Sequence, residues 1–148
     1  MKLSTRGRYG VMALYELAQH CGEGAVSLKT IAENQGISEH YLEQLMSALR
    51  SAGLVKSQRG AQGGYMLAKS PADITIGSII TTMEGPIALV DCLLTGAGDK
   101  GQICDRAAGC VTRGVWEKVC ASISNVLDHI TLADLCRDGA LTEKRGIK

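Results

Sequence analysis

The chain has 148 residues, of which 45% are apolar and 21% charged, and its formal net charge is +1. This length predicts one domain, or one small head with an appendage, and the apolar content excludes a disordered chain. No apolar run approaches the ~18 residues that a membrane span requires, and the N-terminus has no signal-peptide pattern. We therefore expect a soluble, cytoplasmic protein that does not bind membranes.

The charges and the cysteines are unevenly distributed along the chain. Residues 1–70 carry eight Lys and Arg against five Asp and Glu, a net charge of +3, whereas residues 71–148 carry eight against ten, a net charge of −2. A mildly basic first half suits a nucleic-acid surface. The chain has six Cys and no Phe. The core is therefore expected to be aliphatic, and in a cytosolic protein the cysteines indicate metal binding or redox chemistry rather than disulfides.

Three helices are predicted before residue 53. A first helix, ending near residues 21–24, is indicated by the amphipathic spacing of Val11, Leu14, Tyr15 and Ala18. Ser27 is expected to cap a second helix over residues 28–34, and Ser38 to cap a third after a tight turn at residues 35–37. Two helices joined by a short turn that contains Gly are typical of a helix-turn-helix.

A two-stranded hairpin is predicted directly after the third helix. Residues 54–58 and 65–67 have the composition of strands, and residues 59–64 form a glycine-rich tip between them. The order of helix, helix-turn-helix and hairpin predicts a mainly α fold with a small β wing. We expect residues 1–70 to form a winged helix-turn-helix DNA-binding head.

This order assigns roles in DNA recognition. The third helix would present its polar side to the major groove, and the wing would reach the adjacent minor groove or the phosphates. The candidate DNA-binding residues are Ser38, His40, Glu43, Gln44, Lys56, Arg59 and Gly60. The alternative for Arg59 and for His40 is a solvated surface side chain without a role in binding.

Residues 71–148 are expected to hold a linker helix, a loop over about 87–111, a dimerisation helix over about 112–130 and a C-terminal segment. Thr75 is expected to cap the linker helix, which ends at Gly85. Apolar residues of the dimerisation helix follow one another at steps of three and four, a short heptad-like seam for packing against a second copy. They are Trp116, Val119, Ile123, Val126 and Ile130. The alternative is that this helix packs on its own head.

Three cysteines lie in the predicted loop. Cys92, Cys104 and Cys110 are separated by 11 and 5 residues, without the closely spaced pairs that are typical of zinc fingers. Widely spaced thiolates on a glycine-rich loop favour an iron–sulfur cluster; zinc, a thiol redox switch and inert cysteines are the alternatives. The other three cysteines, Cys21, Cys120 and Cys136, lie within helical patterns, where we expect them to be buried as small apolar residues.

Five stretches carry a resemblance to a known family: residues 1–10 (MKLSTRGRYG), 38–45 (SEHYLEQL), 53–65 (GLV followed by RGAQGGY), 104–116 (CDRAAGCVTRGVW) and 130–135 (ITLADL). With these stretches the chain resembles, over nearly its whole length, the Rrf-two-type bacterial regulators. The three cysteines and the Trp that follows the third by six positions make it most similar to the iron–sulfur cluster regulator branch.

The resemblance implies a homodimeric transcription factor, a repressor that binds a palindromic double-stranded operator and is not an enzyme. Cys92, Cys104 and Cys110 would hold a cluster, expected to be [2Fe-2S], and the protein would report cluster supply to the genes for cluster assembly. Cluster-assembly scaffold proteins are expected partners. The resemblance also implies that Glu43 disfavours one class of operator in the cluster-free protein.

Two departures from the family pattern concern the cluster. The gap between the first two cysteines is longer than in enterobacterial-type members, and Arg113 stands where those proteins carry a histidine ligand. Arginine stays protonated and cannot ligate iron. His129 lies 16 residues beyond Arg113, about 24 Å along a continuous helix, and is a poor substitute. The fourth ligand is left open between a residue of a partner chain and one of the carboxylates of Asp91, Asp99 and Asp105.

Three alternatives to a cluster-supply sensor are considered. A nitric-oxide sensor of the same superfamily would carry the same three cysteines. A third type of member governs cysteine metabolism through a partner enzyme and lacks the triad, so the triad counts against it. An iron–sulfur carrier or redox enzyme would not need a winged helix, and the chain has no phosphate-binding fingerprint, HExxH or nucleophile–base motif.

Overall fold

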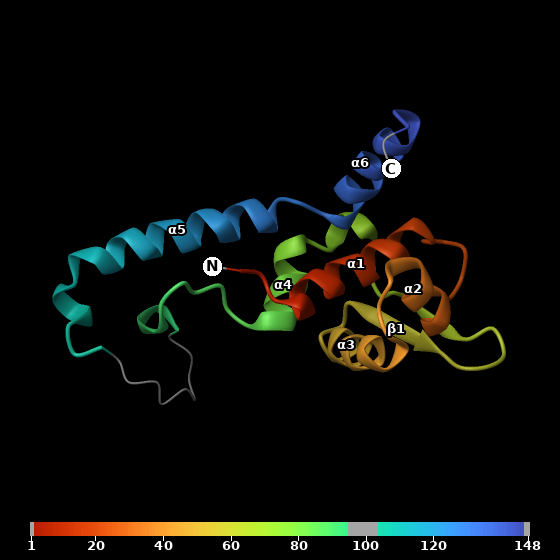
Figure 1. The fold of residues 1–148 in the computed structure, drawn as a ribbon, viewed down its shortest axis with the longest axis horizontal. Helices are drawn as coiled ribbons and strands as arrows, with labels where there is room; N and C mark the ends of the chain where they lie inside the picture. The colour runs from red at the N-terminus through yellow and green to blue at the C-terminus, as the bar shows by residue number, and fades with distance from the viewer. Residues whose placement is uncertain (1, 95–103, 147–148) are drawn as a thin grey trace.

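The computed structural model describes residues 2–94 and 104–146, which form six α-helices and one two-stranded antiparallel sheet (Figure 1). In chain order these are α1 (Thr5–Gln19), α2 (Leu28–Gln35), α3 (Glu39–Ser51), β1 (Val55–Gln58), β2 (Gly64–Leu67), α4 (Ile76–Glu84), α5 (Val111–Asp128) and α6 (Leu132–Lys144). The predicted mainly α architecture with a β wing is confirmed. None of the described helices is both long and apolar enough to cross a bilayer.

Side-chain caps start the helices of the head where the sequence predicts them. The hydroxyls of Ser27 and Ser38 accept hydrogen bonds from the backbone N–H groups of Thr30 (3.1 Å) and Tyr41 (3.3 Å). Each cap satisfies one of the N–H groups that a helix N-terminus leaves unpaired. Gly36 ends α2 with φ 65°, a left-handed conformation that glycine adopts without steric cost. The chain can therefore turn at once into α3.

The core is aliphatic, as the absence of Phe predicts, and it spans both halves of the chain. Fully buried side chains come from α1, α2, α3, α4 and α6, and they include Leu14, Ile31, Leu42, Leu45, Met46, Leu49, Ile79 and Leu132. Burial of one such side chain stabilises the fold by about 1.5–3 kcal/mol relative to exposure. Helix α4, beyond residue 70, packs on α1 within the same core.

The wing is joined to the loop that precedes α2. Strands β1 and β2 pair from Val55 opposite Leu67 to Gln58 opposite Gly64. On the other side of β2, Val26 and Tyr65 exchange two backbone hydrogen bonds, each 2.8 Å long. A Cβ added at Gly64 would run into the Val26 carbonyl, so this close approach requires glycine. The wing is thereby fixed to the helix-turn-helix.

Helix α5 extends away from the head, and its N-terminal end lies far from α3 and the wing (Figure 1). Towards its other end it packs on α4. The predicted helix over 112–130 ends two residues early, at Asp128. The reason is a short antiparallel bridge between Thr75 and Thr131, in which the Ile130 carbonyl accepts a hydrogen bond of 2.8 Å from the Ile76 N–H.

Helix α6 was expected only as a C-terminal segment. It starts with a capping box in which the Thr131 hydroxyl accepts from the Asp134 N–H, and the Asp134 carboxylate accepts from the Thr131 N–H at 2.9 Å. The Thr131 N–H, followed by the Thr131 hydroxyl, holds the pKa of Asp134 below its usual range. A threonine followed three residues later by an acidic residue is a readable helix-start signal.

The cysteines outside the loop do not share one environment. Cys120 is buried and Cys136 is half-buried, which agrees with the expectation. The prediction that Cys21 is a buried thiol is wrong, because Cys21 is exposed. Helix α1 ends at Gln19 with His20 as its cap, so Cys21 falls in the turn that follows rather than on the inward side of a helix.

Candidate functional site

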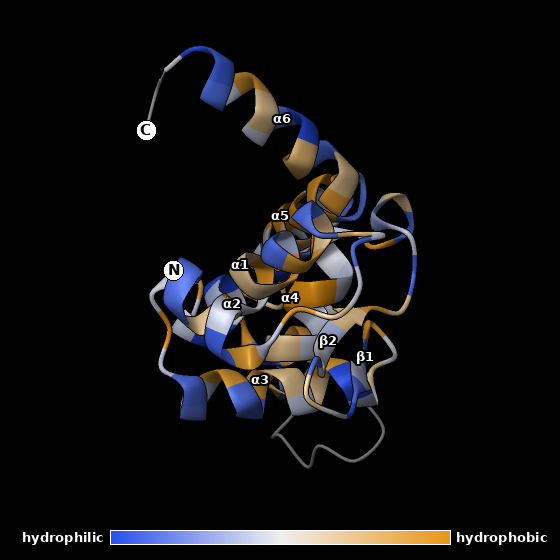
Figure 2. Cartoon of the chain, turned by 90° about the vertical axis from the view of Figure 1, so that its right-hand side faces the viewer, coloured by the Kyte–Doolittle hydropathy of each residue, from blue (hydrophilic) through white to orange (hydrophobic). Residues whose placement is uncertain are grey.

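The outward surface of α3 is polar and open to solvent. Ser38, His40, Glu43 and Gln44 are all exposed, and hydrophilic residues follow the outer edge of α3 in Figure 2. The Ser38 hydroxyl accepts the Tyr41 N–H, and its own O–H stays free to donate, for example to a phosphate. The side chains of His40 and Gln44 lie 3.4 Å apart at their nitrogens. These four predicted residues therefore lie together on one exposed surface.

Three further predicted residues lie on the wing. Lys56, on β1, and Arg59 and Gly60, in the turn before β2, are exposed. Strand β1 packs on α3, and Arg50 at the end of α3 donates to the Ser57 hydroxyl on β1 at 3.4 Å. The polar side of α3 and the wing thus form one continuous surface, which we call the α3–wing surface. A helix and a ribbon side by side match one groove and the neighbouring backbone of B-form DNA.

The three cysteines of the predicted loop flank residues 95–103, which lie outside the described residues, as does the candidate ligand Asp99. Cys92 is half-buried in the 3₁₀ turn Asp91–Leu93, Cys104 is exposed, and Cys110 is half-buried immediately before α5. Cys110 lies at the end of α5 remote from the head (Figure 1). The turn that bears Cys92 follows a segment that contacts the middle of α5, where the Leu89 N–H donates to Cys120 Sγ at 3.3 Å. Within residues 2–94 and 104–146, no three His, Cys, Asp or Glu side chains are close enough to hold a metal ion.

Cys110 has the surroundings of a reactive thiol. Its Sγ lies 3.1 Å from the Thr112 hydroxyl. The hydrogen bond from that hydroxyl, followed by the backbone N–H of Arg113, lowers the pKa of Cys110. Donors at a helix N-terminus stabilise a thiolate, the form of cysteine that binds metals. The donor chemistry at Cys110 therefore fits a metal or cluster, although the described arrangement does not gather the three thiols.

Neither Arg113 nor His129 is placed to serve as a fourth ligand of a cluster. The Arg113 Nε lies 3.0 Å from the Glu117 carboxylate, an ionic contact without hydrogen-bond alignment. His129 follows the opposite end of α5 from Cys110, and its Nδ1 lies 2.6 Å from the Asn125 carbonyl. The two described carboxylates, Asp91 and Asp105, are exposed beside the cysteines.

The predicted seam of α5 is divided between the chain's own core and solvent. Trp116 and Val126 are 39% and 57% exposed, Val119 and Ile123 are half-buried, and Ile130 lies past the end of the helix and packs partly on the core. Ile123 lines a groove of about 410 Å³, shared with Ile80 and Leu127. A second groove of about 300 Å³ continues from it and is lined by Leu3, Val11, Ile76 and Ile80 among others.

A polar group that sequence patterns did not predict lies between α1 and the end of α2. Glu16 of α1 is 4% exposed, and its carboxylate binds side chains from the end of α2. Its partners are 18 and 19 residues away in the chain, so no local spacing signals the contact.

Comparisons with known proteins agree on the class of the chain. The family described as "Rrf2: Iron-dependent Transcriptional regulator" matches residues 3–138. A curated relative, the HTH-type transcriptional regulator CymR of Bacillus subtilis, is 48% identical over 91% of this chain and 89% of its own. The HTH-type transcriptional regulator IscR of Photobacterium profundum is 40% identical over 99% of this chain and 81% of its own.

A solved structure of T. potens IscR is 53% identical, with a TM-score of 0.74 over 94% of this chain and 88% of that one. The relatives are thus divided between IscR and CymR. What they share is the winged helix-turn-helix fold and a role in transcription rather than in catalysis. This chain belongs to the Rrf2 family of DNA-binding transcriptional regulators.

Proposed function

We propose that the protein is a dimeric repressor that binds operator DNA through the α3–wing surface and senses iron–sulfur cluster status through its loop cysteines. The observation that supports DNA reading is the exposure of the polar residues of α3 and of Arg59 on the wing, whose strand β1 packs on α3. Base edges in the major groove offer donors and acceptors to His40 and Gln44, while Lys56 and Arg59 neutralise phosphates or enter the minor groove.

The second copy in this proposal packs along α5. Val115, Trp116 and Val126 are exposed apolar side chains on one side of this helix, and the two grooves beside its C-terminal half are lined by apolar residues of α1 and α4. Burial of this surface against its twin provides a hydrophobic driving force, and a two-fold dimer would present two α3 helices to a palindromic site.

Cys92, Cys104 and Cys110 are the residues that we propose to hold the cluster. Their thiols are half-buried or exposed. The hydrogen bond from the Thr112 hydroxyl, followed by the backbone N–H of Arg113, lowers the pKa of Cys110 and so favours its thiolate form. Ligation requires Cys92, Cys104 and Cys110 to come closer together than in the described arrangement. When bound, the cluster supplies a centre whose loss or oxidation signals cluster demand. We further propose that the cluster is a [2Fe-2S] centre and that Asp91 or Asp105 supplies an oxygen as its fourth ligand.

The test is the iron and acid-labile sulfide content of protein purified without oxygen. Cys104→Ala is expected to lose the visible absorption bands and most of the iron while it keeps the wild-type fold by circular dichroism. The matched control is Cys21→Ala, since Cys21 is also an exposed thiol but lies outside the loop. Equal iron content in Cys104→Ala and in the wild type would contradict the assignment.

A second candidate is favoured by the 48% identity with CymR of Bacillus subtilis. In this case the protein is a regulator of the CymR type, and its three loop cysteines carry no cluster. Wild-type protein that stays free of iron and sulfide after anaerobic reconstitution would favour this candidate. A cluster that forms but is released by nitric oxide at the concentration that derepresses transcription would instead favour a nitric-oxide sensor.

A further inference from the structure

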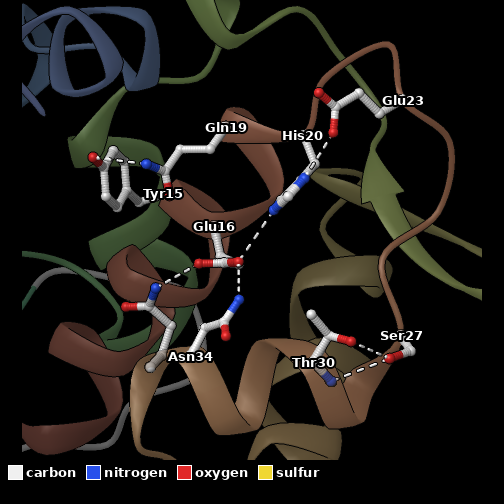
Figure 3. Close-up of polar contacts among 9 residues, drawn as sticks. Tyr15, Glu16, Gln19, His20, Glu23, Ser27, Thr30 and Asn34 are labelled. Carbon is white, nitrogen blue, oxygen red and sulfur yellow. Dashed lines mark hydrogen bonds and ion pairs between the residues drawn. The ribbon is translucent and has the colours of Figure 1, made fainter. Parts of the chain in front are cut away.

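A buried carboxylate joins α1 to the helix-turn-helix. Glu16 is 4% exposed on α1, and its two oxygens accept hydrogen bonds of 2.7 Å from Asn34 Nδ2 and from Gln35 Nε2 (Figure 3). Both donors belong to the last turn of α2. Hydrogen bonds to a charged group are stronger than those between neutral groups, and an unpaired buried charge is costly. This cluster therefore resists any movement of α2 relative to α1.

The position of these donors connects the cluster to α3. Asn34 and Gln35 immediately precede Gly36, the turn residue, and the next N–H, that of Ile37, donates to the Ala32 carbonyl at 3.0 Å. Ile37 is buried, and α3 begins two residues later at Glu39. A shift at the end of α2 would therefore displace the start of α3, where Ser38 and His40 lie.

We propose that Glu16 is a positioning residue for DNA binding: its carboxylate clamps the end of α2, and through the adjoining turn the start of α3, to α1. The inference rests on the proposed reading of DNA by α3. It adds a residue that does not itself touch DNA, because Glu16 is only 4% exposed on α1 and its oxygens are bound to α2.

His20 links this clamp to pH. Its Nδ1 lies 2.8 Å from Glu23 Oε2 and its Nε2 lies 3.3 Å from Glu16 Oε1. The hydrogen bond with Glu23, and then the contact with Glu16, raise the pKa of His20 above the usual 6.5. The other titratable groups near His20 are Lys56 of β1, Tyr65 of β2 and Cys21, which line a cavity of about 180 Å³ with it. Next to Glu16 in the chain, Tyr15 faces α6, and burial followed by the charges of Cys136 and Glu143 raises the pKa of Tyr15.

The raised pKa fixes the direction of the pH effect. A cationic His20 balances the buried carboxylate, and this contribution is fully present below the ordinary imidazole pKa of 6.5. It is lost as the pH rises through the higher pKa of the folded protein. The clamp should therefore loosen at mildly alkaline pH and tighten at mildly acidic pH.

The first experiment is amide hydrogen exchange of the full chain, measured by mass spectrometry on peptides from residues 28–38. Glu16→Gln is expected to speed exchange there about tenfold, the effect of losing one charge-assisted hydrogen bond, while peptides of α5 keep the wild-type rate. The matched control is Glu33→Gln, the same chemical change at an exposed position of α2. Exchange in Glu16→Gln no faster than in Glu33→Gln would overturn the proposal.

A compensating variant separates positioning from general destabilisation. Asn34→Asp in the Glu16→Gln background returns one carboxylate–amide contact with the charge moved to α2, and it should restore slow exchange. Asn34→Asp alone places two carboxylates in contact, so amide exchange in residues 28–38 should be faster than in Glu16→Gln and than in the double variant. Independent, additive effects of the two changes would contradict a direct clamp.

The second experiment measures affinity for a duplex of about 30 base pairs that the wild type selects from a randomised pool. His40 stays in place in every protein, so any pH dependence that the α3 imidazole contributes is common to all of them. Between about pH 6 and pH 9, the fall in affinity should be larger in the wild type than in Glu16→Gln and in His20→Gln, by about threefold or more. An equal fall in all three proteins would overturn the proposal. If the wild type selects no duplex, the proposed function in DNA binding is contradicted. The hydrogen-exchange test of the Glu16 contact does not depend on that result.

Discussion

Arg59 lies in the turn between β1 and β2, exposed at the end of the wing. A guanidinium at this position neutralises a phosphate or enters the minor groove, so Arg59→Ala is expected to weaken DNA binding by about 1–3 kcal/mol. If the contact is to phosphate, the slope of log affinity against log salt should also decrease by about one. Fluorescence anisotropy of a labelled duplex at several salt concentrations measures both quantities.

The control for Arg59 is Arg145→Ala, which removes the same charge from the exposed C-terminal end of α6. Long-range attraction alone would make the two losses equal, because each variant lowers the net charge by one. A loss confined to Arg59→Ala identifies a contact. Equal small losses would leave Arg59 as a solvated surface charge.

Single residues differ in how far the sequence discloses their role. Ser27 and Ser38 are predictable caps because the hydrogen bond is local: the backbone N–H three residues further on donates to the serine hydroxyl. Glu16 is not predictable, because its partners approach only when α1 and α2 pack. The prediction for Cys21 fails because of a helix boundary. Helix α1 ends at Gln19, two residues before Cys21, so this thiol lies in an exposed turn instead of on the buried side of the helix.

At the scale of elements, the wing is held by its close approach to the loop before α2. Gly64→Ala would push a methyl group into the Val26 carbonyl and break the paired hydrogen bonds between Val26 and Tyr65. We expect a loss of about 1–3 kcal/mol in the free energy of unfolding. Urea unfolding, with the midpoint compared at an unchanged slope, measures it.

Gly114→Ala is the matched control for the wing, because a Cβ at Gly114 meets nothing within 4 Å and the residue lies inside α5. Alanine is favoured over glycine within a helix, so this variant should be more stable by about 0.5–1 kcal/mol. The two substitutions should therefore change stability in opposite directions. A Gly64→Ala protein as stable as the wild type would mean that the wing is not fixed by this contact.

Most elements could be predicted from the sequence, and the exceptions have physical reasons. Helices α1 to α4 and both strands carry a cap, an apolar period or a glycine turn that acts over a few residues. The apolar steps of α5 continue to Ile130 and so predict a helix that is two residues too long. The backbone bridge between Thr75 and Thr131 holds the chain extended there, and α5 ends at Asp128. Helix α6 was missed although Thr131 and Asp134 mark its start.

At the scale of the whole molecule, the exposed apolar side of α5 is the surface that we expect to pair two chains. Val126→Asp places a charge there, and burial of an unpaired charge in an apolar interface costs several kcal/mol. We expect the variant to sediment as a monomer at concentrations at which the wild type is a dimer. Val126 is a sharper choice than Ile123, because Ile123 also lines a groove of its own chain.

Asn125→Asp is the control for the dimer, since it introduces the same charge at the neighbouring exposed position, about 100° further round the helix. It should leave the dimer intact. If Val126→Asp stays dimeric as well, the second copy binds elsewhere. The oligomeric state could not be read from the sequence, because the same apolar period serves packing within a chain and packing between chains.

The length of α5 has a mechanical consequence. Its 18 residues span about 27 Å, with Cys110 at one end and the packing on α4 near the other. A tilt of about 5° at the packed end therefore moves the cysteine end by about 2 Å. Conversely, a displacement of about 2 Å at the Cys110 end corresponds to a rotation of only about 5° where α5 packs on α4. One additional helical turn in α5 would change that ratio without altering either end.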